Sequence, residues 1–235
     1  MSVQLEEERA RAELRARQGV GARYDAEAAP GAELLWARRG TAYLARKLNE
    51  LTDEDLDRPG RDGASRRRVI ARIAYQARAL AQLIEGVRMG AAEPMDGALD
   101  AFEGEIVDAE TLPAHALRYL FAHSEIHLNV EWRDLPNAGW RSALSRPSGW
   151  AITPADTVLL RARGVWGGAV ALGNGARFGD APADLISALG EQVGRYWRAR
   201  GLAADLVLGP AELARWLLGA GPADAAGLPS LPEIF

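Results

Sequence analysis

The sequence contains no cysteine among its 235 residues. Disulfide bonds, thiol nucleophiles and cysteine-ligated metal sites are therefore excluded. Lysine is almost as scarce, because Lys47 is the only one and the chain otherwise uses arginine for its permanent positive charges. Together with abundant alanine and glycine, this usage is typical of a GC-rich bacterial genome and carries no information on function.

Long apolar runs are also missing. No stretch of the sequence is long enough to span a membrane, and the start, MSVQLEEERARAELRARQ, lacks the apolar core of a signal peptide. The net charge of −4 gives no general attraction to nucleic acid or to anionic membrane surfaces. We therefore expect a cytoplasmic protein whose partner is a small molecule, with no nucleic acid and no membrane.

Apolar residues recur at helical spacing along most of the chain. Ser65 can cap one helix, and Thr153 with Pro154 and Asp156 makes a favourable start for another. The pattern predicts helices at 33–51, 65–89, 113–135, 159–172, 182–200 and 210–218. The charged run over 4–17 is typical of a solvated helix, and ADLVLG at 204–209 of a short strand. Long amphipathic helices joined by loops favour a helical bundle.

One predicted helix contains an unusual number of glycines. The stretch LRARGVWGGAVALGNGARF, residues 160–178, carries Gly164, Gly167 and Gly168 within five positions. Each glycine in a helix interior costs about 1 kcal/mol relative to alanine. A rival interpretation makes VLLRARGVWGGAVAL a β-strand, since valine and tryptophan suit strands. If the segment is a helix, its glycines need a compensating reason.

Several blocks of the chain resemble the mycothiol-dependent maleylpyruvate isomerase family, within the DinB-like superfamily. They run in family order over roughly residues 33–235 and read ARRGTAYLARKL, SRRRVIARIAYQARAL, LRYLFAHSEIHLNVEWRDLP, LRARGVWGGAVALGNGARFGDAPADL, GPAELARWLLGA and LPSLPEIF. The resemblance implies a mainly α fold, a four-helix bundle with a divalent metal between its helices and a small C-terminal α/β domain, here shortened. It divides the chain into a charged N-terminal segment (1–32), the bundle (33–178) and the C-terminal domain (179–235).

The metal ligands that the resemblance implies are absent from this chain. The ligand histidine of the family motif W-[ST]-R-x-H-V-x-A-H is Arg72, and an earlier histidine is Arg68. The glutamate and histidine of R-E-V-x-x-H are Gly164 and Gly168, and a usual asparagine is Gln76. Arginine stays protonated and glycine has no donor side chain, whereas a zinc site needs at least three protein ligands. We therefore expect no metal and no other cofactor.

The changed positions form two stripes. Arg68, Arg72 and Gln76 lie at i, i+4 and i+8 on one helix, and Gly164 and Gly168 lie on another. In the family these stripes face each other across the metal, so we expect a cavity with Arg72 at its wall and the glycines opposite. Such a cavity suits an anionic ligand. Alternatively, the arginines fill the space themselves and pair with internal acids such as Glu125 or Glu131.

All three histidines, His115, His123 and His127, fall on one predicted helix. His123, His127 and Glu131 at i, i+4 and i+8 form a possible metal-binding face. A packing or polar-pocket role is favoured, because family members resemble this block and bind their metal elsewhere. Either His123 or His127 could act as a general base. Tryptophans are expected in the core, with Trp166 as a pocket-lining candidate; the set is Trp132, Trp140, Trp150, Trp166, Trp197 and Trp216.

Two functions of different class remain open. The first is a metal-independent enzyme that isomerises, cyclises or otherwise rearranges a small anionic metabolite, in a setting such as specialised biosynthesis. In it, Arg72, His123 and His127 are the catalytic candidates, and the binding candidates are Arg68, Gln76, Gly164, Trp166 and Gly168. The second is a non-catalytic ligand- or partner-binding relic that retains the fold.

Overall fold

The computed structural model describes residues 24–91, 100–144, 152–199, 201 and 208–219. Helices dominate this part of the chain, and its β-structure is limited to two isolated bridges, Pro59 with Ser65 and Leu144 with Ile152. The mainly α prediction is confirmed. The β-strand alternative for 158–172 is wrong, because this stretch is almost entirely helical. Within the described residues, no helix has the length and apolar character needed to cross a membrane.

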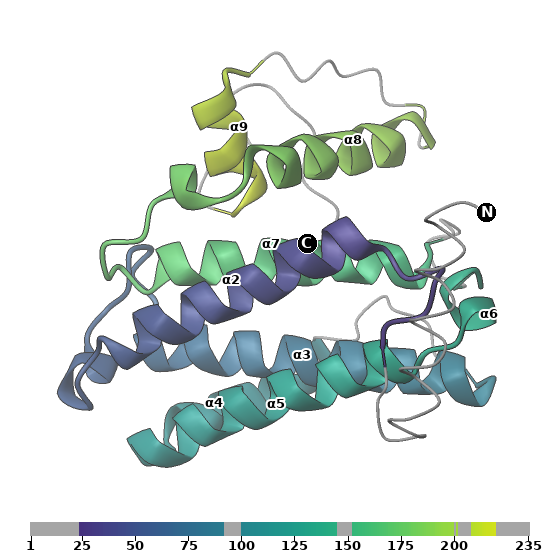
Figure 1. Ribbon diagram of the computed structural model, residues 1–235. Coiled ribbons are helices and arrows are strands. Elements are labelled where there is room, and N and C mark those ends of the chain that lie inside the picture. The colour runs from purple at the N-terminus through teal and green to yellow at the C-terminus, as the bar shows by residue number, and fades with distance from the viewer. Residues whose placement is uncertain (1–23, 92–99, 145–151, 200, 202–207, 220–235) are drawn as a thin grey trace, which may run out of the picture.

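Four long helices form a bundle (Figure 1). They are α2 (Gly31–Asn49), α3 (Arg66–Met89), α5 (Ala114–Asp134) and α7 (Pro154–Ala171). Helix α2 packs along α7, α3 packs along α5, and α3 also contacts α7, which joins the two pairs. Their inward faces supply a single apolar core. This arrangement confirms the predicted four-helix bundle.

The predicted helix starts are found where local chemistry defines them. The hydroxyl of Ser65 accepts a hydrogen bond from the backbone N–H of Arg68 at 3.0 Å and caps α3. At the start of α7, the Asp156 carboxylate accepts from both the backbone N–H and the hydroxyl of Thr153, with Pro154 at the first helical position. These ends fix where the bundle helices begin.

Several short elements were not predicted from the sequence. They are η2 (Glu54–Asp57), η3 (Asp100–Phe102), α4 (Glu103–Glu110), α6 (Asn137–Trp140) and η4 (Phe178–Asp180). Helix α4 packs on α3 and buries only Ile106 and Ala109. Two buried positions give too weak a periodic pattern to predict a helix, yet α4 decides where the α3 arginines point.

Two further helices lie beside the bundle (Figure 1). Helix α8 (Ala183–Ala199) contacts α7, and α9 (Pro210–Leu217) packs on α8 with the rings of Trp197 and Trp216 5.6 Å apart. The predicted helix over 4–17 and residues 204–207 of the predicted strand lie outside the described residues. Leu208 and Gly209, the rest of that strand, have no regular secondary structure. The division of the chain at 32 and 178 stays a prediction.

The tryptophan prediction is confirmed for the residues that the structure describes. At most 7% of the surface of each is exposed, for Trp132, Trp140, Trp166, Trp197 and Trp216. Trp150 lies outside the described part of the chain.

Candidate functional site

The three glycines of α7 are points of close helix contact. A Cβ atom on Gly164 would clash with the side-chain amide of Gln76, and one on Gly168 would lie 2.8 Å from Cδ1 of Ile73. A Cβ on Gly167 would clash with the backbone carbonyl of Leu218, just after α9. The space left by the missing side chains is therefore filled from α3 and α9. The predicted cavity between α3 and α7 is wrong, because Gln76 and Ile73 occupy that volume.

A cavity does lie along the same stretch of α7, on the side that faces the end of α9 and η4. Its volume is about 250 Å³. We call it the α7–α9 cavity, and its described lining is Asp62, Arg163, Gly164, Gly167, Gly168, Ala171, Phe178, Leu218 and Gly219. Gly164 and Gly168, at the family's ligand positions, therefore line a cavity other than the predicted one, and its described lining does not include Arg72.

Arg163 places a buried positive charge in the wall of this cavity. Only 9% of its surface is exposed, and its Nε donates a hydrogen bond to the backbone carbonyl of Leu217, which ties α9 to α7. Burial lowers the pKa of Arg163 to about 10, so the guanidinium stays charged at neutral pH. The sequence analysis missed this residue as a candidate, although it is the arginine that opens the R-G-V-W-G-G motif.

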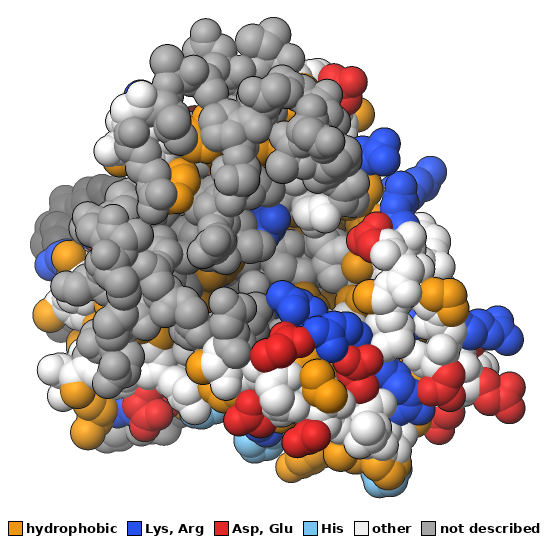
Figure 2. All heavy atoms as spheres, turned by 180° about the vertical axis from the view of Figure 1, so that it is seen from behind, with side chains coloured by type: hydrophobic (Ala, Val, Ile, Leu, Met, Phe, Trp, Pro, Cys, Tyr) orange, Lys and Arg blue, Asp and Glu red, His pale blue; other side chains and the backbone are white. Residues whose placement is uncertain are grey.

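Arg68 and Arg72 do not face the bundle interior. The side chain of Arg72 is 47% exposed, with its Nη1 3.5 Å from Oε2 of Glu103. Arg68 is partly exposed and pairs with Glu103 and, at 2.7 Å, with Glu110. Both acids belong to α4, which draws the guanidinium groups outward and spares the cost of burying them. Arg72 therefore does not line the described α7–α9 cavity. Basic and acidic side chains likewise gather together on the face seen in Figure 2.

Comparison with known proteins identifies the scaffold. The family model for the mycothiol maleylpyruvate isomerase N-terminal domain matches residues 37–173. The chain belongs to this family. Two crystal structures of mycothiol-dependent maleylpyruvate isomerase are similar to it, with TM-scores of 0.71 and 0.72 and sequence identities of 27% and 28%; the second is a histidine-to-alanine variant. Each comparison covers 86% of this chain and 95% of the other. No curated protein matches.

The residues at the ligand positions of the maleylpyruvate isomerase family do not fit a metal ion. Arg72 offers a guanidinium, a donor group that stays protonated, and directs it towards Glu103. Gly164 and Gly168 offer no side chain, and Gln76 and Ile73 occupy the space beside them. A zinc site requires at least three protein donors. The donor set at these positions therefore cannot hold the metal that the resemblance implies.

The histidines lie on the outward face of α5 and do not contribute to the cavity. His123 is exposed, with its ring 5.7 Å from that of Tyr119. His127 is partly exposed, and its Nε2 lies 3.8 Å from Oε1 of Glu131. The exposure of His123 does not fit a packing role, whereas His127 lies beside the buried Glu131. Within the described residues, no three His, Asp or Glu side chains are arranged to hold a metal ion.

Trp166 packs α7 against α2. Its ring stacks on Tyr43 with 5.1 Å between the centroids, and its indole Nε1 donates to the backbone carbonyl of Trp36 at 3.1 Å. Gly40 of α2 provides the close approach, since a Cβ there would lie 2.7 Å from this indole nitrogen. Trp166 is therefore a core residue and is not part of the described lining of the α7–α9 cavity.

A polar network crosses the centre of the bundle. Arg161 is fully buried, and its Nη2 contacts the carboxylate of Glu125. Its Nη1 donates to the carbonyl of Ile73 at 2.7 Å and to Oε1 of Gln76 at 2.8 Å. Thr41 donates to the other oxygen of Glu125 at 3.1 Å. All four bundle helices are therefore linked by one set of polar contacts.

The expected pairing of an inward arginine with Glu125 is present, but with a different arginine. Arg68 and Arg72 are the arginines that the sequence predicts for this role, whereas Arg161 fills it. Burial lowers the pKa of Arg161 to about 9, and the adjoining carboxylate favours the charged form. Glu131 pairs with Arg88 at 3.1 Å.

Proposed function

We propose that the protein binds a small anionic metabolite in the α7–α9 cavity and rearranges it without a metal ion. The observation that carries this proposal is the position of Arg163. Its buried guanidinium lines the same cavity as Gly164 and Gly168, which stand where the family has two metal ligands. A fixed positive charge thus lies beside these two positions, on the side of α7 that faces the end of α9, whereas Gln76 and Ile73 fill the space towards α3.

The chemistry follows from the charge and the proton acceptor in the cavity wall. A guanidinium in a poorly hydrated site binds carboxylate or enolate oxygens strongly and stabilises negative charge as it develops. Asp62 lines the same cavity and supplies a carboxylate that accepts a proton from carbon and returns it elsewhere. An isomerisation or cyclisation of this kind needs no redox partner. It also proceeds without mycothiol, the thiol that the names of the two similar enzymes give as their requirement.

The cavity volume limits the substrate. Pockets for drug-sized ligands span about 300–1,000 Å³, and this cavity is about 250 Å³. The substrate is therefore a compact acid. Maleylpyruvate, which the two similar structures are named for, is the natural first compound to assay.

Asp62→Asn tests the proposal without disturbing the core, because Asp62 is exposed at the cavity mouth. We expect the variant to retain binding of the acid and to lose turnover by about 100-fold or more, the usual range for a removed general base. Asp57→Asn, at another exposed acid that does not line the cavity, is the matched control and keeps full activity. Equal turnover in Asp62→Asn and Asp57→Asn would exclude Asp62 from the chemistry.

A second candidate function is ligand binding without catalysis. It is favoured by the placement of His123 and His127 on the outer face of α5, since Asp62 is then the only carboxylate or histidine in the described lining of the cavity. Saturable binding of small acids with no turnover in native protein would select this candidate over the enzyme.

A further inference from the structure

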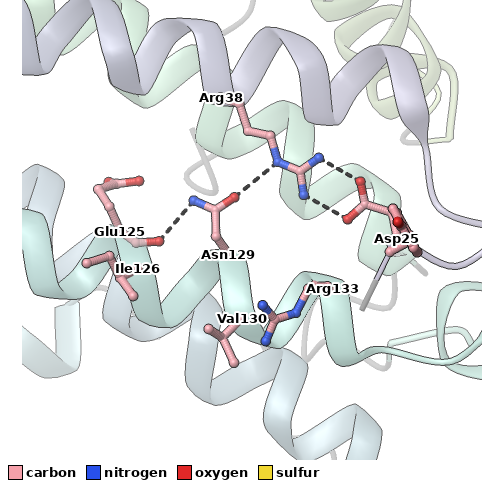
Figure 3. Close-up of a pocket in the computed structure, with 8 residues that line it drawn as sticks. Asp25, Arg38, Glu125, Ile126, Asn129, Val130 and Arg133 are labelled. Atoms are coloured by element: carbon pink, nitrogen blue, oxygen red, sulfur yellow. Dashed lines mark hydrogen bonds and ion pairs between the residues drawn. The ribbon is translucent and has the colours of Figure 1, made fainter. Parts of the chain in front are cut away.

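A second cavity lies between α2, α5 and the segment that precedes α2. Its volume is about 480 Å³, and we call it the α2–α5 groove. Figure 3 shows Arg38 reaching down from α2 towards Asn129 and Asp25, with Arg133 below them on α5. Among the residues that the structure describes, the groove and the α7–α9 cavity share no lining residue.

The guanidinium of Arg38 is already arranged to bind a carboxylate. Its Nη1 and Nη2 donate to the two carboxylate oxygens of Asp25 at 2.6 and 2.8 Å. Its Nε donates to Oδ1 of Asn129 at 3.1 Å, and the amide of Asn129 donates to the backbone carbonyl of Glu125 at 3.0 Å. Asn129 therefore fixes the plane of the guanidinium, and the paired Nη groups match a carboxylate in the geometry that arginine binds best.

The charges around this anchor favour an anion at the position of the Asp25 carboxylate. Glu125 forms the inner end of the groove, but its carboxylate is in contact with Arg161 and so is neutralised. Arg133 also lines the groove, with its Nε donating to Oδ1 of Asp134 at 3.1 Å. The hydrogen bond from Arg38, and to a lesser extent the charges of Arg38 and Arg133, keep the pKa of Asp25 below its usual value despite partial burial. A carboxylate at the position of the Asp25 side chain is thus held by positive charge from both helices.

Apolar side chains lie next to the charged anchor. Ile126 is 65% exposed and Val130 is partly exposed, and both line the groove. Tyr24, next to Asp25, adds an aromatic ring. An apolar body attached to a carboxylate would cover these side chains and remove their surface from water.

We propose that the α2–α5 groove is a second ligand site, which takes a small carboxylate with an apolar or aromatic body, and that Asp25 holds its anchor in the free protein. The Asp25 and Arg38 side chains are each about one-third exposed, 32% and 38%. Both side chains are within reach of solvent, so a carboxylate from solution takes the place of Asp25 when the Asp25 side chain rotates away. The anchor is therefore both preformed and open to competition.

Benzoate is a suitable probe, and the full chain is titrated with it while the methyl signals of Ile126 and Val130 are followed by NMR. Asp25→Ala removes the competing carboxylate and is expected to tighten benzoate binding at least tenfold. Asp184→Ala, the same substitution at an exposed position on α8, serves as the control and leaves the affinity unchanged. Benzamide, which has the same shape without the charge, is expected not to bind to either variant.

Two further variants separate the anchor from general charge effects. In the double variant Asp25→Ala with Arg38→Gln, we expect the increase in benzoate affinity caused by Asp25→Ala to disappear. Arg133→Gln, which leaves the Asp25–Arg38 pair in place, weakens benzoate binding to the native chain about threefold or more. The proposal is overturned if Asp25→Ala binds benzoate no more tightly than Asp184→Ala, if benzamide binds equally well, or if benzoate shifts signals near Phe178 instead of those of Ile126 and Val130.

Discussion

The guanidinium of Arg161 is in direct contact with the carboxylate of Glu125 at the centre of the bundle, where only 0% and 6% of these residues' surfaces are exposed. The pair joins α7 to α5, and its other contacts extend to α2 and α3. Removing one partner of such a pair leaves an uncompensated buried charge, whereas removing both leaves none.

Arg161→Ala is therefore expected to destabilise the fold by about 3–5 kcal/mol, measured as the free energy of unfolding in urea. The double change Arg161→Met with Glu125→Leu keeps the volume and removes both charges, so it should cost clearly less than the single change. If the double variant is as unstable as the single one, the ion pair is not the source of the loss.

The close contacts at the α7 glycines lead to a second prediction, on the stability of variants that add a side chain there. Gly167→Ala drives a methyl group into the Leu218 carbonyl and should destabilise the protein by about 1–3 kcal/mol, the usual cost of overpacking. Gly104→Ala on α4 is the control, because a Cβ there meets nothing within 4 Å, and it should be neutral or stabilising. Thermal unfolding of both variants gives the comparison, and equal effects would contradict the close contact.

Tyr43 should contribute a loss of stability between pH 10 and 12, opposite in sign to the contribution of the buried Arg161 and Arg163, whose pKa values are lowered. Burial, followed by its hydrogen bond to Asp180 at 2.6 Å, raises the pKa of Tyr43 to about 12. In the unfolded chain the pKa of tyrosine is about 10, so the unfolded state loses its proton first and the stabilisation disappears as pH rises through the folded value. Tyr43→Phe should remove this contribution, so that the slope of stability against pH is more positive in the variant than in native protein, as urea unfolding at pH 9, 10 and 11 would show. An identical slope in native protein and variant would refute the assignment.

The helices and their ends were accessible from the sequence because their causes are local. Ser65, and Thr153 with Asp156, bond to backbone groups within three residues, so a short motif was sufficient to place the starts of α3 and α7. The resemblance to the family predicted the four-helix bundle. The loss of the family's metal ligands was visible from the residue types at three single positions, Arg72, Gly164 and Gly168.

The candidate site was only partly accessible, because side-chain direction depends on distant partners. Arg68 and Arg72 were placed inward from helical spacing alone, but the acids of α4 pair with them on the outside. Gly164 and Gly168 line the α7–α9 cavity, but the cavity forms only because the end of α9, 54 residues further along the chain at Leu217, packs beside Arg163. A charged residue that follows an apolar run, such as Arg161 after Val158–Leu160, could have indicated a buried polar network, but helical spacing alone does not identify it.

Activity after removal of metal tests the central claim most directly. The protein is dialysed against a chelator, its metal content is determined, and rearrangement of maleylpyruvate is followed with and without added zinc. Because Arg72, Gly164 and Gly168 offer no metal ligand and Arg163 supplies the charge, we predict a stripped protein whose turnover equals that of untreated protein and does not respond to zinc. One zinc ion per chain, with turnover that is lost on chelation and restored by zinc, would contradict the account.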